Sequence, residues 1–181
     1  MMNMGEINVI AWSKDSFLVL SDFQAESNPA TFEDSHSAIK YRYTWTVNSD
    51  KMGSQILFFI ENIQLSVEFH PVLSWVRTSQ ATDILLKHEQ GHFDLAELVK
   101  RENLEKLQNK FYGKRFPTRG QNEEQRKQFA KEDSGKMISE EIEKLEQVLS
   151  QRRQEYDNQT DFGNDLEKQS EYNLTFDKLR L

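Results

Sequence analysis

Residues 81–103 read ATDILLKHEQGHFDLAELVKREN, and the apolar residues in this stretch recur at helical spacing. The side chain of Ser79 or Thr82 can cap the first turn of a helix here, because its hydroxyl can accept a hydrogen bond from a free backbone N–H. We therefore expect a helix that runs from this cap through both histidines of the stretch toward Asn109.

The two histidines, His88 and His92, stand four residues apart, with Glu89 beside the first. A helix turns about 100° per residue, so the two imidazoles lie within about 40° of each other and can bind one ion. Glu89 is offset by about 100°, which places it beside the ion and leaves it free to take a proton from a zinc-activated water. The pattern therefore predicts a Zn²⁺ site held by His88 and His92, with Glu89 as general base.

The same helix cannot supply a third metal ligand. The next carboxylates, Asp94 and Glu97, lie about 240° and about 180° around the helix from His88, on its far side. We interpret both as groups that anchor the helix or orient its histidines. The third ligand is therefore expected from another part of the chain.

Length, charge and composition limit the class of protein. A chain of 181 residues predicts a single domain over residues 1–181, strand-rich in residues 1–77 and helix-rich in residues 78–181. The net charge of −7 argues against a nucleic-acid or anionic membrane partner, and no apolar stretch approaches the roughly 20 residues that span a bilayer. Because there is no cysteine, a thiolate zinc site is excluded. No signal peptide is recognisable, so the expected location is the cytoplasm, or an exported one if a leader is missing.

The chain outside the histidine helix shows strand character first and helical character later. Residues 38–47 alternate apolar and polar side chains, residues 55–69 are similar, and residues 51–54 are typical of a hairpin connection. Residues 121–153 predict a surface helix with a narrow apolar stripe, and the tail from Asp165 is expected to return as a short helix. The predicted fold class is α+β, with an antiparallel or mixed sheet packed on the histidine helix and further helices after it.

The stretch SWVRTSQATDILLKHEQGHFDLAE, residues 74–97, resembles a bacterial domain-of-unknown-function family of predicted zinc-dependent proteases in the zincin superfamily. The similarity extends to a Trp-Ser pair at residues 12–13, an Asp-Phe pair at 22–23 and an aromatic strand at 39–43. The family's C-terminal pattern Tyr-Asp-x-x-Thr-x-His-Gly is matched at residues 156–163, except at its histidine. The resemblance implies a zincin-like fold and a zinc metallopeptidase that hydrolyses peptide bonds in a peptide or protein substrate.

Phe162 stands where the family pattern has that histidine. If the histidine is the usual third ligand, this chain has lost it; Asp161 is then the first candidate to replace it, with Asp157 and His70 as alternatives. Tyr156 is a candidate catalytic residue that donates a hydrogen bond to the developing oxyanion. Its alternative role is structural, as a buried phenol whose hydroxyl is satisfied within the core.

The resemblance also implies that a sheet edge above the histidine helix binds an extended peptide as an added strand, and residues 58–69 are the candidate edge. Phe162 motivates an alternative function, a catalytically impaired zincin-like binding or scaffold protein. A third interpretation is a structural α+β domain with an accidental motif. The oligomeric state does not follow from the sequence.

Overall fold

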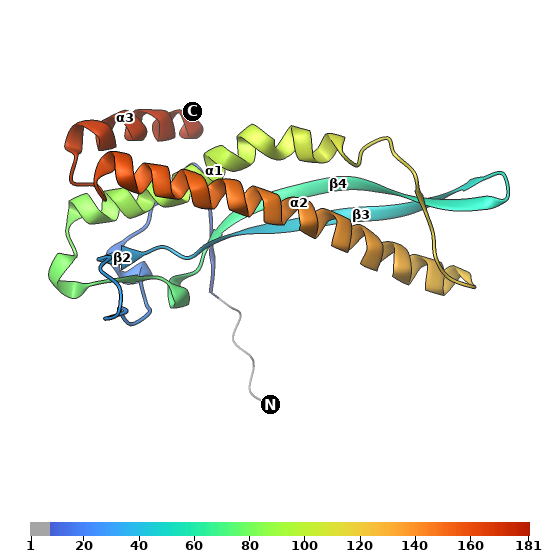
Figure 1. Ribbon diagram of the computed structural model, residues 1–181, viewed down its shortest axis with the longest axis horizontal. Helices are drawn as coiled ribbons and strands as arrows, with labels where there is room; N and C mark the ends of the chain where they lie inside the picture. Colours follow the sequence, from blue (N-terminus) through green and yellow to red (C-terminus); the bar gives the residue numbers. More distant parts are fainter. Residues whose placement is uncertain (1–7) are drawn as a thin grey trace.

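The computed structural model describes residues 8–181 and shows an α+β fold with three α-helices in that part of the chain (Figure 1). The helices are α1 (Asp83–Asn109), α2 (Glu123–Thr160) and α3 (Leu166–Asp177). The strands are β1 (Ile10–Ala11), β2 (Ser35–His36), β3 (Ile39–Met52), β4 (Gln55–Phe69), β5 (Trp75–Val76) and β6 (Phe116–Pro117). Short 3₁₀ turns cover Leu20–Asp22, Pro71–Leu73, Thr78–Gln80 and Lys178–Arg180. The predicted α+β class with antiparallel sheets is confirmed.

Strands β3 and β4 form one long antiparallel hairpin, in which Ile39 lies opposite Phe69 and Met52 opposite Gln55. The register shifts between Thr44 and Thr46, opposite Asn62, whose φ is 52°. This bulge changes which alternate residues of β4 are buried, so that one face of the strand stays on the core despite the extra residue.

Strand β4 lies inside its sheet, between β3 on one side and both β1 and β6 on the other. Between β1 and β6, one side chain from the last turn of α1 and one from just beyond it form hydrogen bonds with the backbone of Ile63. The Tyr112 hydroxyl accepts from its N–H at 2.9 Å, and Gln108 Nε2 donates to its carbonyl oxygen at 3.0 Å. The expectation that residues 58–69 offer a continuous free edge to a peptide strand is therefore wrong, because both ends of the segment and Ile63 already have partners on that side.

Helices α1 and α2 pack against this sheet, α1 on β4 and α2 along β3 (Figure 1). The N-terminal half of α1, the C-terminal end of α2, α3 and β2 gather at one end of the molecule, away from the tip of the hairpin (Figure 1). Here β2 pairs with β5 in a separate two-stranded sheet. None of the helices in residues 8–181 is long and apolar enough to cross a membrane.

The helix over the histidine stretch begins as the sequence predicts, since the Thr82 hydroxyl accepts a hydrogen bond from the Leu85 N–H at 3.2 Å. Helix α2, in contrast, continues past the expected end near Arg153 to Thr160. The buried stripe that includes Leu149 continues to Tyr156 and gives these turns a face to bury. The continuation matters because it places Asp157 on a helix that contacts α1.

Candidate metal centre

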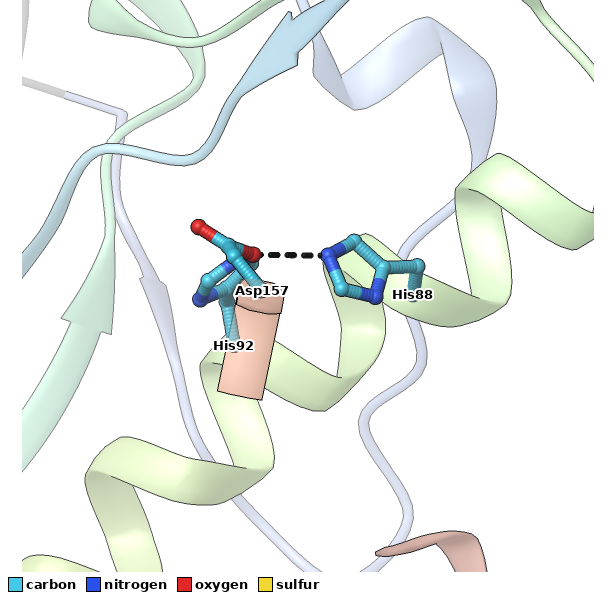
Figure 2. Close-up of side chains that lie close together, drawn as sticks. All are labelled: His88, His92 and Asp157. Atoms are coloured by element: carbon cyan, nitrogen blue, oxygen red, sulfur yellow. Dashed lines mark hydrogen bonds and ion pairs between the residues drawn. The ribbon is translucent and has the colours of Figure 1, made fainter. Parts of the chain in front are cut away.

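Two turns of α1 and one turn of α2 bring together three side chains that could hold a metal ion (Figure 2). Asp157 Oδ1 lies 2.8 Å from His88 Nε2 and 2.7 Å from His92 Nε2. One ligand atom from each residue lies within 4.8 Å of the others. The histidines are 1 % and 4 % exposed, whereas the Asp157 side chain is 22 % exposed. The cluster is thus a buried site that solvent can reach from the Asp157 side.

The structure brings Asp157, and not the preferred candidate Asp161, to the two histidines. Asp161 caps the end of α2 with a left-handed φ of 47° and its side chain is exposed. The chain turns away there, while Asp157, one turn earlier, still faces α1. His70, the other alternative, lies at the end of β4 beside Glu68 and outside the cluster.

The ring of His88 is oriented by α3. Gln169 Nε2 donates to the Tyr156 hydroxyl at 2.8 Å and to Asn173 Oδ1 at 3.0 Å, so Gln169 Oε1 is left to accept. His88 Nδ1 lies 2.9 Å from that oxygen and therefore carries the ring proton. In the neutral ring, His88 Nε2 then turns a lone pair toward Asp157 Oδ1, which is also an acceptor. A metal ion held between these two acceptors would satisfy both.

His92 completes the pair of imidazoles from the next turn of α1. Burial and the nearby positive charge of Arg153 lower the pKa of His92, against the opposite influence of Asp157 and Glu89. The lower pKa favours the neutral imidazole, which is the form that binds a metal ion. Among residues 8–181, no partner lies within hydrogen-bond distance of its buried Nδ1.

Glu89 is held by strand β2. Its Oε1 accepts from the Ser35 hydroxyl at 2.5 Å, and its Oε2 accepts from the Ser37 hydroxyl. Burial by itself raises the pKa of Glu89, but the neighbouring His92 and the two serine hydroxyl groups outweigh it and hold this pKa below its ordinary value. Glu89 is therefore a carboxylate at neutral pH, fixed in position beside the histidines.

Tyr156 has the structural role and not the expected catalytic one. Its hydroxyl donates to the backbone oxygen of His88 at 2.9 Å and accepts from Gln169, and the side chain is fully buried. Its ring stacks on the His88 imidazole, with centroids 4.5 Å apart and planes 10° from parallel. Burial raises the pKa of this phenol. A hydroxyl whose proton is already donated inside the core cannot stabilise an oxyanion in the site.

Phe162 lies on the wall of a pocket of about 890 Å³ that opens onto the three metal-binding residues. Its ring meets that of Phe32 edge to face, with centroids 6.3 Å apart. The backbone turn from Asp161 to Gly163 is left-handed throughout, with φ values of 47°, 54° and 93°. Phe162 thus contributes apolar surface to the mouth of the pocket.

Of the two carboxylates on the far side of α1, Asp94 anchors the helix as predicted, whereas Glu97 pairs only within the helix. Asp94 Oδ1 accepts from Trp12 Nε1 at 2.9 Å and from Arg180 Nη2 at 2.7 Å, which ties both ends of the chain to α1. Glu97 forms ion pairs with Lys100 and Arg101 along the same helix.

The sequence did not lead us to the residues that surround the two histidines and Glu89. Ser35 and Ser37 could have been predicted to lie on one side of the chain, because alternate residues of an extended segment point the same way. Gln169 carried none, since its approach to His88 depends on how α3 packs. Arg153 was overlooked because the helix was expected to end there, although its position four residues before Asp157 places both on one face.

No protein-family model matches this chain, and no match was found among curated proteins or solved structures. The class of site is therefore defined by the geometry alone: a buried cluster of two histidines and one aspartate that could hold a metal ion.

Proposed function

We propose that the protein is a zinc-dependent metallopeptidase of zincin-like fold, with the metal held by His88, His92 and Asp157. The observation that carries the proposal is the convergence of both Nε2 atoms on Asp157 Oδ1. Two imidazoles and one carboxylate, with a further position open to solvent, are the donor set of catalytic zinc sites in hydrolases. The orientation of His88 by Gln169 supports this, because histidine ligands usually donate their other N–H to such a partner.

In this proposal, Glu89 is the general base. A bound zinc ion would supply Lewis acidity, lowering the pKa of a water to about 7. The Glu89 carboxylate accepts the proton of the attacking water and later returns it to the leaving amine. Ser35 and Ser37 hold the carboxylate in position during both steps.

The shape of the pocket supports an extended peptide as substrate. One stripe of α2, from Glu146 through Ser150 to Asp157, lines the pocket, and β2 and the start of β3 face it. This stripe is about 17 Å long by helical rise, which matches about five residues of extended chain. The Arg77 N–H donates to the Asp34 carbonyl oxygen, so one edge of the β2 segment faces β5. The alternate backbone groups, those of Ser35 and Ser37, face the opposite direction.

The second candidate function is a non-catalytic binding protein, and a specific observation favours it. Asp157 already contacts both histidines directly, as it would in a structural ion-pair cluster that never binds a metal. Zinc binding therefore separates the two functions.

The test is calorimetric zinc titration of chelator-treated protein, followed by peptide-library cleavage. The wild type is expected to bind one zinc ion, Asp157→Asn to bind it about 100-fold more weakly or worse, and Asp161→Asn, the matched control, to bind normally. Glu89→Gln is expected to bind zinc and to lose cleavage. Equal cleavage by Glu89→Gln and wild type would contradict the proposal. No zinc binding by the wild type would contradict it too and would favour the binding protein.

A further inference from the structure

Arg153 is a largely buried cation on the pocket wall, one helical turn before Asp157 on α2. Its Nη2 donates to the backbone oxygen of Ser37 at 2.8 Å. Within residues 8–181, no carboxylate oxygen lies within 4.0 Å of its guanidinium. Arg153 thus lacks the partner that a buried charge usually has.

Two carboxylates that act on Arg153, those of Glu89 and Asp157, already have other partners. Glu89 and Asp157 act on the guanidinium from a distance, yet burial still lowers the pKa of Arg153. The Glu89 oxygens accept from two serine hydroxyls, and Asp157 contacts the two histidines. A guanidinium has five N–H donors, so several remain for a group that enters the pocket.

We infer that Arg153 donates a hydrogen bond to the carbonyl oxygen of the scissile peptide bond and stabilises the oxyanion that this oxygen becomes. The inference rests on the proposed peptidase function. It supplies a hydrogen-bond donor for the oxyanion, a role that Tyr156 cannot have because its hydroxyl proton is donated inside the core. As the water oxygen bonds to the carbonyl carbon, its proton moves to Glu89 and the π electron pair of C=O moves onto the oxygen beside Arg153. When the C–N bond breaks, that pair re-forms C=O and Glu89 returns the proton to the amine nitrogen.

The pocket favours this role over capture of a substrate's terminal carboxylate. An arginine that binds a C-terminal carboxylate marks the end of the substrate chain, whereas this pocket continues beyond Arg153 along α2, through Ser150 and Leu149 to Glu146. Glu146 would also repel a carboxylate. Substrate chain can therefore extend past Arg153, and the bond that is cut is an internal one.

The first test compares Arg153→Met and Arg153→Lys with Arg152→Met. Arg152 is a matched control, since it is the next residue along α2 but pairs with Glu102. Arg153→Met is expected to lower kcat on an internally quenched peptide by about 100- to 1,000-fold, with KM and zinc affinity changed far less. Arg153→Lys should recover part of kcat because it retains the charge, and Arg152→Met should behave like the wild type.

The second test measures binding and needs no turnover. A phosphinic peptide carries an anionic PO₂⁻ group in place of the scissile carbonyl, and its binding to the zinc-loaded proteins is followed by calorimetry. Arg153→Met should bind it about 100-fold more weakly than Arg152→Met, whether the peptide ends in a free carboxylate or an amide. A loss seen only with the free carboxylate would show that Arg153 binds the chain terminus and would overturn the inference.

The two proposals fail in different ways. If the wild type binds zinc and cleaves peptides but Arg153→Met retains wild-type kcat and phosphinate affinity, the inference alone is wrong. If the wild type binds no zinc, the proposed function is wrong and the inference falls with it. If Arg153→Met loses zinc affinity and thermal stability together, the side chain has a structural role. That result would also overturn the inference.

Discussion

Gly91 shows at the scale of one residue why the motif has no side chain between its glutamine and second histidine. A Cβ at this position would lie 1.9 Å from the Tyr156 hydroxyl oxygen and 2.7 Å from Cζ of the same ring. The Tyr156 hydroxyl donates to the backbone oxygen of His88, so it must lie close to the surface of α1. The absence of a side chain at Gly91 leaves room for it there and allows the Tyr156 ring to stack on His88. Gly163 packs similarly, since a Cβ there would lie 2.9 Å from His88 Cβ.

Gly91→Ala is therefore expected to destabilise the protein, although the same change inside an ordinary helix stabilises it by about 1 kcal/mol. Displacing the fully buried Tyr156 should lower the free energy of unfolding by about 1–3 kcal/mol, measured by urea denaturation. Adding Tyr156→Phe removes the atom that clashes most, so the double variant should lose less than the sum of the two single losses. Strict additivity, or a gain in stability from Gly91→Ala, would contradict this packing.

Strand β2 is the element that joins the sheet side of the molecule to Glu89, the proposed general base. Its small sheet with β5 fixes the segment from one edge, while Ser35 and the following Ser37 present hydroxyls to Glu89. The same segment receives Arg153 from α2 through the Ser37 carbonyl. This short strand thus connects the groups proposed to move the proton and to stabilise the oxyanion.

Ser37→Ala is expected to lower the free energy of unfolding by about 1–3 kcal/mol, because a buried carboxylate loses a hydrogen-bond donor. Chemical denaturation at pH 7 measures the loss. Ser139→Ala is the control, since its hydroxyl bonds only within α2, and a change within about 0.5 kcal/mol is expected there. In a Glu89→Ala background the cost of Ser37→Ala should shrink, and an undiminished cost would show that the hydroxyl serves something other than Glu89.

At the scale of the whole molecule, burial makes folding sensitive to acid. Burial lowers the pKa of His36, His70 and His92 from their ordinary value of 6.5. The unfolded chain therefore takes up protons near pH 6.5 that the folded chain takes up only at lower pH. Stability from these groups is present above pH 6.5 and is lost as the pH falls below it. The pKa values of Glu89 and Asp157 are also lowered, so their contribution is lost at still lower pH.

The metal-free protein should therefore lose stability as the pH falls below the ordinary histidine value of 6.5. Urea denaturation of chelator-treated protein at several pH values measures this slope. His92→Gln removes one of the three groups and should make the slope shallower. A stability that rises toward pH 5.5 would mean that the histidines gain protons on folding, contrary to their burial.

The two residues of α1 that could hold a metal ion were predictable from the sequence, because spacing by four on a helix places two side chains on one face. The same rule correctly excluded Asp94 and Glu97 from the metal and predicted the cap at Thr82. Alternation of apolar and polar residues was likewise enough to predict the β3–β4 hairpin, since a strand also has a single repeat. These are local properties that no distant contact needs to supply.

Only the tertiary structure decided the third member of the cluster and the roles of the residues around it. Asp157 and Asp161 are one helical turn apart. The sequence does not say that α2 ends at Asp161 in a left-handed turn that leads to α3. Whether the Tyr156 hydroxyl faces the pocket or the backbone of α1 depends on the depth to which two helices pack. The approach of Arg153 to the Ser37 carbonyl joins segments 116 residues apart. Such contacts depend on packing between elements, for which local spacing holds no information.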